Sequence, residues 1–436
     1  MLRPTLFVPV LALIVAVGAL HGDLSAKSVG GTGPGGPRSL PAPTGSFKVG
    51  RVTISLTDPS RQERVPPGGG ARALMMDVWY PAEGSNAPAA SYFEGAAFSR
   101  PEATEILKRY LGAAFSSVRA GLVTTHAVDA AVFARGAGPS PVLLFSHGGG
   151  EARETYATQL ADLASHGYVV AAFTHTFDSV LAVFPDGRHA PMVPDRWPPP
   201  KTSEIPRLPP SEEASPERLR WWADDMRFVL DQLTRLNRTG ASAPPFAGHL
   251  DLSRTGAFGH SAGGQASAQA CQIEPRLRAC LNQDGLSAMA PYYLDARGWG
   301  MDQAFMLIVR AAPAAPPTDD ELALMKLTRG QAVDLLAQVR NRQDLTLRRT
   351  GQGAYRITLS AEVTSHADFG DLRLLQARDG REAAMRAHVL RVVTDITRAF
   401  FDRALKGTKA PLPDPAATGG IVERVEEFPA ATRFNR

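Results

Sequence analysis

The stretch Thr255–Gly264 reads TGAFGHSAGG and contains the pattern Gly-x-Ser-x-Gly, with Ser261 at its centre. An apolar run typical of a strand precedes the serine, and a small-residue run typical of a helix follows it. At such a strand-to-helix turn the serine Oγ projects clear of the sheet, and the flanking glycines tolerate the crowding because they carry no Cβ. The stretch therefore predicts that Ser261 is a nucleophile.

A serine nucleophile needs a general base, and the base needs a carboxylate that orients it. Only two histidines follow Ser261 in the chain. His366 lies in TSHADFGD, just beyond a strand-like run, where a loop can carry it over the sheet edge. His388 falls inside a helical pattern and is interpreted as a surface or packing residue. We therefore expect His366 to be the base.

Three aspartates compete for the role of the acid. Asp284 lies in ACLNQDG, at the end of the strand-like run that follows the nucleophile. Asp319 and Asp320 come after the next strand, but their neighbours AAPAAPPT suggest an excursion away from the sheet. Because functional residues of parallel sheets gather at the carboxyl ends of strands, the placement favours Asp284.

The stretch Leu144–Gly150 reads LFSHGGG and follows another strand-like run. Its glycines allow backbone N–H groups to approach a developing oxyanion closely. We expect the N–H groups of Gly149 and Ala262 to form the oxyanion hole. His147 is interpreted as a brace for this loop, not as a base.

Short apolar runs alternate with helical patterns along most of the chain. The strand-like runs are 73–80, 142–145, 168–173, 255–258, 305–309 and 355–359, and amphipathic stripes run through 219–233 and 389–400. This alternation predicts a mostly parallel central sheet with helices on both faces. Together with the chain order Ser, Asp, His, it indicates the α/β-hydrolase fold.

The N-terminus has the layout of a signal peptide. Arg3 precedes an apolar run over 6–20, and small residues follow. We expect a signal peptide over 1–26, a Gly/Pro-rich linker over 27–46, and export to the periplasm or the medium. The alternative is an uncleaved membrane anchor.

The remainder is expected to form one catalytic domain over 47–410, followed by a C-terminal tail over 411–436. Two segments, 181–216 and 311–350, interrupt the alternation of strands and helices; the second continues as a helical pattern from Glu321 to about Arg340. Each is either an insertion that acts as a lid over a pocket or surface decoration.

The composition gives no indication of nucleic acid as a partner, because the net charge is only +4 and no dense Lys/Arg run occurs. A pI near 9.1 is compatible with transient contact at an anionic membrane surface. The two cysteines, Cys271 and Cys280, lie outside metal-ligand spacing. They form either a disulfide or two buried thiols. No metal site and no oligomeric state are predicted.

Four blocks of the sequence resemble the platelet-activating-factor acetylhydrolase-like group of α/β-hydrolases, as a bacterial, exported member. They are MDVWYPA (76–82), LFSHGGG with LASHGYVVAAFTHTFDS (163–179), FGHSAGGQA with LNQDG, and SHADFGD with FFDRALKG (400–407). The resemblance implies hydrolysis of short or oxidised acyl esters of phospholipids, or of simpler carboxylic esters, without a metal or organic cofactor. It also implies that Asp284 is the acid, through the Leu-x-x-Asp-Gly block.

Other functions use the same parts. A cutinase- or lipase-type enzyme would act on polyesters or triglycerides, and an acyltransferase would differ only in its acceptor. A hydrolase-fold protein that has lost catalysis would serve as a binding module, but such proteins usually lack a triad member, and here all three are present. A small-molecule or lipid ester is the expected substrate.

Overall fold

The computed structural model describes residues 40–65, 70–194, 216–285, 300–311, 318–319, 322 and 328–431. The predicted signal peptide and most of the predicted linker lie outside the described residues. So do residues 195–215 of the first expected insertion, and in the second residues 312–317, 320–321 and 323–327.

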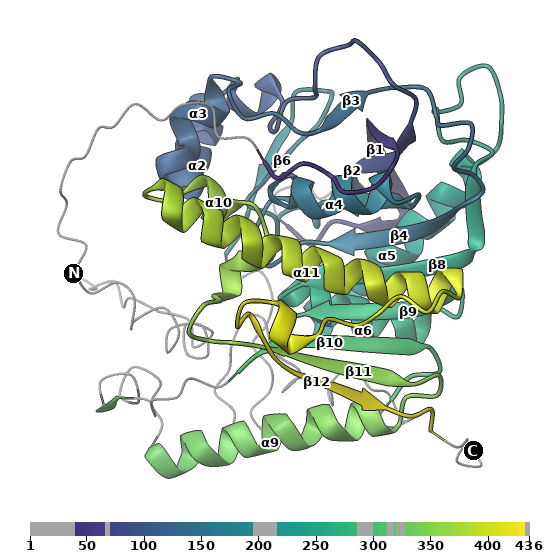
Figure 1. The fold of residues 1–436 in the computed structure, drawn as a ribbon. Helices are drawn as coiled ribbons and strands as arrows, with labels where there is room; N and C mark the ends of the chain where they lie inside the picture. Colours follow the sequence, from purple (N-terminus) through teal and green to yellow (C-terminus); the bar gives the residue numbers. More distant parts are fainter. Residues whose placement is uncertain are drawn as a thin grey trace.

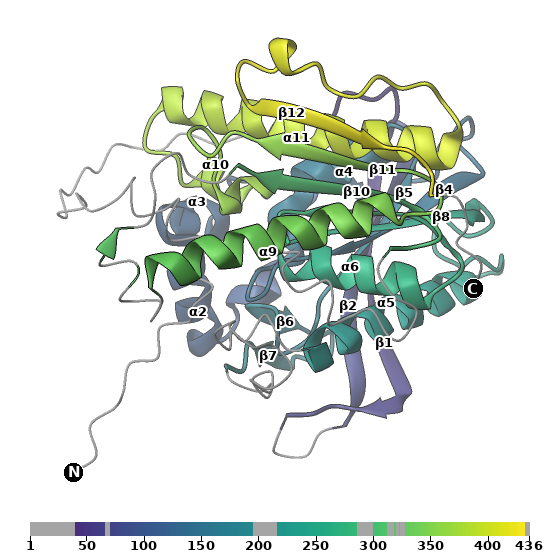
Figure 2. The same ribbon diagram turned by 90° about the horizontal axis from the view of Figure 1, so that it is seen from below.

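A ten-stranded sheet in the order β12-β11-β10-β9-β8-β4-β5-β2-β1-β3 forms the centre of the molecule (Figures 1 and 2). Its strands are β1 (Lys48–Gln62), β2 (Ala71–Ala82), β3 (Ala127–Asp129), β4 (Ser140–Ser146), β5 (Val169–Phe173), β8 (Leu250–His260), β9 (Leu277–Gln283), β10 (Ala304–Arg310), β11 (Ala354–Leu359) and β12 (Val422–Phe428). The central strands from β5 to β11 run parallel, whereas β2 and β12 pair antiparallel with their neighbours. All six predicted strands lie in this sheet, and its mostly parallel character is confirmed.

Central strands of the sheet are buried on both faces. Every residue of β4 is buried. Leu143 and Phe145 join the core cluster under one layer of helices, whereas Val142 and Leu144 join the cluster under the other. Because side chains alternate along a strand, a continuous apolar run indicates a sheet that is covered on both sides.

Helices form the two outer layers, as Figure 2 shows. One layer consists of α4 (Ala157–Ser165) and α11 (Gly380–Lys406), and the other of α5 (Pro216–Leu236), α6 (Ala262–Ile273) and α9 (Arg329–Arg348). The shorter elements are η1 (Gly95–Phe98), α2 (Pro101–Leu111), η2 (Gly112–Ala114), α3 (Phe115–Arg119), η3 (Arg153–Tyr156), η6 (His366–Phe369), α10 (Leu372–Leu375), η7 (Pro415–Ala417) and the hairpin of β6 (Leu181–Val183) and β7 (His189–Pro191). Among the described helices, none has the length and apolar character needed to cross a membrane.

Described residues near both ends of the expected catalytic domain contact that domain. Leu40 is buried, and the hydroxyl of Thr44 donates to Asp162 on α4 at 2.8 Å. At the other end β12 pairs with β11, and its Glu426 accepts hydrogen bonds from Arg356 at 2.7 Å. Both segments are therefore part of the domain, and their polar residues contribute to the contacts that hold them there.

The second expected insertion also differs from its prediction. The helical pattern pointed to a helix from Glu321 to about Arg340, whereas α9 begins at Arg329 and continues to Arg348. Thr328 caps its N-terminus by accepting from the N–H of Gln331, whose side chain accepts from the N–H of Thr328. This reciprocal cap fixes the start of the helix.

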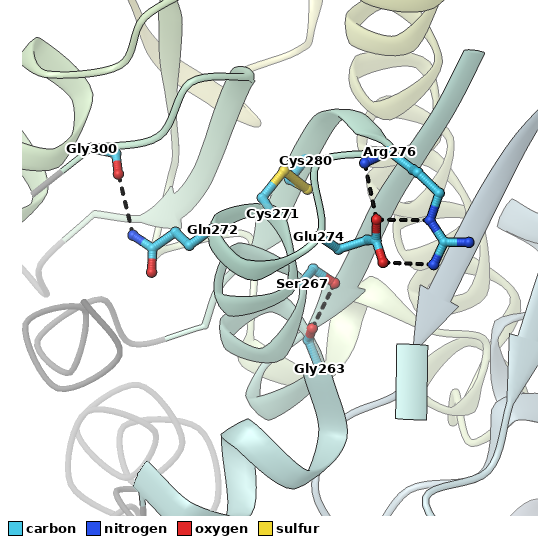
Figure 3. Close-up of a disulfide and its surroundings, with 8 residues drawn as sticks. All are labelled: Gly263, Ser267, Cys271, Gln272, Glu274, Arg276, Cys280 and Gly300. Atoms are coloured by element: carbon cyan, nitrogen blue, oxygen red, sulfur yellow. Dashed lines mark hydrogen bonds and ion pairs between the residues drawn. A yellow bond between two sulfur atoms is a disulfide. The ribbon is translucent and has the colours of Figure 1, made fainter. Parts of the chain in front are cut away.

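The two cysteines form a disulfide, which decides between the alternatives left open by the sequence. Cys271 lies in the last turn of α6 and Cys280 in β9 (Figure 3). Between them, Glu274 and Arg276 form an ion pair with a closest distance of 2.7 Å. The bond therefore ties the helix that begins after Ser261 to the strand that precedes Asp284.

Candidate active site

Ser261 lies at the turn between β8 and α6, with φ 54° and ψ −123°. This conformation is strained for a residue with a side chain. The turn packs closely against the end of β4: a Cβ on Gly259 or Gly263 would stand only 2.4 Å or 2.1 Å from the carbonyl oxygen of Ser146. Both glycines of the pattern are thus required by this close approach, which holds the serine in its strained geometry.

The structure brings together the three residues that the sequence selected. His366 Nε2 lies 2.9 Å from Ser261 Oγ, and His366 Nδ1 lies 2.7 Å from Asp284 Oδ2. His366 begins η6, beyond the end of β11, and Asp284 follows directly after β9. The three side chains meet because their strands end at the same edge of the sheet.

The rival residues lie elsewhere. Asp319 is 92% exposed at its side chain and pairs with Arg329, and Asp320 lies outside the described residues. His388 is exposed on α11, as expected for a helix surface residue.

Asp284 has a second partner that sequence reasoning missed. Arg310, the last residue of β10, donates from Nε to Asp284 Oδ2 at 2.7 Å and from its backbone N–H to Oδ1 at 3.2 Å. Burial raises the pKa of Asp284, but the Arg310 guanidinium and His366 outweigh burial and hold that pKa well below its usual range. The strand-end argument that selected Asp284 could have identified Arg310, because β10 is the next parallel strand.

The ionised state of Asp284 fixes the proton positions. An ionised carboxylate only accepts hydrogen bonds, so His366 donates from Nδ1 to Asp284. Its Nε2 is then the acceptor for the Ser261 hydroxyl proton. This arrangement can remove the proton from Ser261 Oγ as the oxygen attacks an electrophile.

The loop after β4 lies beside the nucleophile. His147 is fully buried; its Nδ1 donates to the carbonyl of Gly148 at 2.7 Å, and its Nε2 accepts from the N–H of His175 at 3.1 Å. Burial lowers the pKa of His147 to about 3, so the ring stays neutral near neutral pH. The N–H groups of Gly149 and Ala262 donate no hydrogen bond to a described residue, so both predicted oxyanion donors have free hydrogen-bonding capacity.

A buried relay of side chains supports the end of β4. Ser146 Oγ lies 2.8 Å from His175 Nε2, and His175 Nδ1 lies 2.8 Å from Asp225 Oδ2. Asp225 faces the guanidinium groups of Arg72 and Arg61 at 2.7 and 2.8 Å. All of its members except Arg61 are fully buried. The order Ser-His-Asp repeats that of the Ser261 site, but these three side chains are fully buried, and their effect is to brace the loop that begins at His147.

A second network joins this loop to the residue before the nucleophile. The Tyr156 hydroxyl donates to Glu151, lies 2.8 Å from His260 Nδ1 and accepts from the N–H of Gly148 at 3.3 Å. The ring of His260 lies 4.5 Å from that of His366. Burial raises the pKa of Glu151, but His260, His366 and His147 together outweigh burial and lower that pKa below its ordinary value. An ionised carboxylate therefore lies close to the base.

Comparisons with known proteins show what the chain is similar to. Residues 35–197 match the family model "Platelet-activating factor acetylhydrolase, isoform II". A protein of Arthroderma benhamiae named "Probable 1-alkyl-2-acetylglycerophosphocholine esterase" is 27% identical over 259 residues, a match that spans 56% of this chain and 58% of that protein's length. A ferulic acid esterase from Streptomyces cinnamoneus superposes with a TM-score of 0.63 and 24% identity, over 89% of this chain and all of that one.

The comparisons establish the fold and show which proteins the chain is similar to. The structural likeness confirms the predicted α/β-hydrolase fold. The family model and the relative are both named for ester-hydrolysing proteins, and the chain spans 58% of the length of that relative. Over residues 35–197 the chain is similar to the acetylhydrolase family, and this range contains the first two of the four sequence blocks.

No group of three or more His, Cys, Asp or Glu side chains in the described part of the chain could hold a metal ion.

Proposed function

We propose that this protein hydrolyses carboxylic esters through an acyl-serine intermediate on Ser261. The observation that carries the proposal is the continuous hydrogen-bond chain from Ser261 Oγ through His366 to Asp284, with distances of 2.9 and 2.7 Å. A nucleophile, a base and an orienting carboxylate in this geometry are the parts that acyl transfer requires.

The reaction proceeds in two halves. Ser261 Oγ attacks the ester carbonyl while His366 Nε2 takes its proton, and the tetrahedral oxyanion accepts hydrogen bonds from the N–H groups of Gly149 and Ala262. Each such donor contributes about 3 kcal/mol to the transition state. The C–O bond to the alcohol then breaks, and His366 returns the proton to the departing oxygen. Water attacks the acyl-serine by the same route and releases the carboxylic acid.

The substrate class in this proposal is a short-acyl ester, including acetylated or oxidised phospholipids. Two findings support it: the match to the acetylhydrolase family model, and the relative whose printed name is an acetylglycerophosphocholine esterase.

A series of p-nitrophenyl esters from acetate to palmitate tests both parts of the proposal, with wild type and Ser261→Ala in parallel. We expect activity to peak at acyl chains of two to four carbons and to be lost in the variant. A peak at long acyl chains would indicate instead the substrate class of a lipase or cutinase. Equal turnover by a folded Ser261→Ala protein would exclude Ser261 as the nucleophile.

The proposal includes export of the protein. The positively charged and apolar N-terminus supports it, and so does the Cys271–Cys280 disulfide, because disulfides persist mainly in oxidising compartments. N-terminal sequencing of protein recovered from cell fractions should give a chain that begins near Lys27 in the periplasm or medium. An intact N-terminus on cytosolic protein would contradict export, and an intact one in the membrane fraction would indicate an anchor.

A further inference from the structure

A buried arginine lies beside the loop that carries Gly149. Arg218, in the first turn of α5, is only 6% exposed. Its guanidinium carbon stands 4.9 Å from the centre of the Trp222 ring, one turn further along the helix. The side chain is thus held between the helix and the sheet end, and does not extend into bulk solvent.

The hydrogen-bond donors of Arg218 are not used by the part of the chain that the structure describes. Its charge is balanced by Asp178, but the Nε to Oδ1 distance is 3.5 Å, and Nε is buried without a hydrogen-bond partner. Asp178 instead accepts from Trp222 Nε1 at 2.9 Å. Because an unmet buried donor costs free energy, a guanidinium that makes no hydrogen bond to the described residues favours a ligand that would supply one.

The guanidinium is directed at the predicted oxyanion loop. Arg218 Nη2 lies only 2.7 Å from the point where a Cβ on Gly149 would stand. Gly149 and Gly150 are both partly exposed. The N–H of Gly150 donates to the carbonyl of Asp178 at 2.8 Å, which holds the loop and the ion pair in one unit.

A second acidic side chain near the loop has partners other than Arg218. Glu151 follows Gly150, but its carboxylate is engaged by the Tyr156 hydroxyl and lies 3.2 Å from His260 Nδ1. A planar guanidinium with unused donors recognises phosphate or carboxylate oxygens through parallel hydrogen bonds. The chemistry of the site is therefore that of an anion subsite next to the reacting carbonyl.

We propose that Arg218 binds an anionic group of the substrate, a phosphate or a carboxylate carried near the scissile ester. This inference rests on the proposed ester hydrolysis and adds a preference for anionic over neutral esters. Hydrogen bonds to charged groups of this kind change affinity by about 10- to 100-fold.

Matched acetate esters test the proposal, with acetate release as the common readout. The phosphate arm compares monoacetylglycerol phosphate with monoacetylglycerol, and the carboxylate arm compares 5-acetoxypentanoate with pentyl acetate. We expect wild type to have a kcat/KM about tenfold or more higher for the anionic member of at least one arm. The arm with the larger ratio identifies the anion. Arg218→Gln should remove that ratio, mainly through KM, and Arg218→Lys should retain part of it.

Arg220→Gln is the control, because Arg220 lies on the same helix but is exposed. It should leave the preference of wild type unchanged. Equal kcat/KM for anionic and neutral esters in wild type would overturn the subsite while leaving the ester hydrolase intact. If Arg218→Gln lowers kcat/KM by the same factor for the anionic and the neutral ester of each arm, Arg218 only braces the loop. If wild type hydrolyses none of the four esters and no p-nitrophenyl ester, the proposed function itself fails.

Discussion

Replacing Arg310 with Gln should raise the pH at which the enzyme loses activity on the acid side. Arg310 Nε and His366 Nδ1 both lie 2.7 Å from the same oxygen of Asp284. The guanidinium therefore opposes the positive charge that His366 acquires when it takes the serine proton. Its removal stabilises the protonated form of the Asp284–His366 pair and raises the apparent pKa of that pair.

The size of the shift follows from the geometry. Because the two nitrogens share one oxygen, they are at most about 5 Å apart, and two unit charges at that distance repel by about 3 kcal/mol at an effective dielectric constant near 20. This corresponds to about two pKa units, and the partial exposure of His366, 16% at its side chain, reduces it by screening. We expect a rise of about one to two units. The backbone N–H of residue 310 still holds Asp284 Oδ1, so the carboxylate keeps its place.

The assay is the pH dependence of kcat/KM for p-nitrophenyl acetate between pH 4 and 9. The acid limb should move to higher pH in Arg310→Gln, with activity near pH 8.5 within about tenfold of wild type. Arg51→Gln is the control: it removes a buried arginine that pairs with Asp129 on the far side of the sheet, and it should leave the limb unmoved. An unchanged or lowered limb in Arg310→Gln would refute the reasoning.

Three further predictions concern the loop, the stability of the fold and the disulfide. Gly149→Val should lower kcat by about 100-fold, because the new Cβ would stand 2.7 Å from Arg218 Nη2 and displace the loop that carries the oxyanion donor. Near-normal turnover by the folded variant would remove Gly149 from the oxyanion hole. Asp371 is fully buried, and burial raises its pKa from 3.8 to about 7, so its contribution to stability is lost as the pH rises between these values. The free energy of unfolding of Asp371→Asn should therefore rise relative to that of wild type from pH 4 to pH 8, by about 4 kcal/mol at most. A difference in melting temperature between the two proteins that stays constant with pH would contradict this. Replacing Cys271 and Cys280 together with Ser should lower the free energy of unfolding, measured with urea, by about 2–3 kcal/mol without changing the ester preference. An unaltered urea midpoint would count against a stabilising disulfide.

The sequence allowed the central sheet to be predicted because local patterns determine it. The six buried runs form strands between β2 and β11, since each is apolar on both faces and bounded by turn residues. Ser261, His366 and Asp284 were selected by their positions after strands, and parallel strands end at the same edge. Edge strands escaped prediction: β12 reads VERVEEF, and its exposed charges hide the alternation that would mark a strand.

The supporting residues could not be read in the same way. Arg218 and Asp178 are 40 positions apart, and nothing in their local sequence indicates that a helix start meets a loop. Asp225 was hidden in an amphipathic helix, where an acidic residue ordinarily faces solvent, yet it is fully buried against Arg72. Such contacts depend on how helices pack over the sheet, a property that local periodicity does not determine.

Trapping the acyl-enzyme tests the central claim most directly. Wild type mixed with p-nitrophenyl acetate and quenched in acid within the first turnover should carry one acetyl group, and peptide mass spectrometry should place it on Ser261. Ser261→Ala should carry none under the same conditions, and His366→Ala should acquire it far more slowly. Acetylation of another residue, or turnover of the ester by folded wild type with no acetyl group on Ser261, would contradict the account.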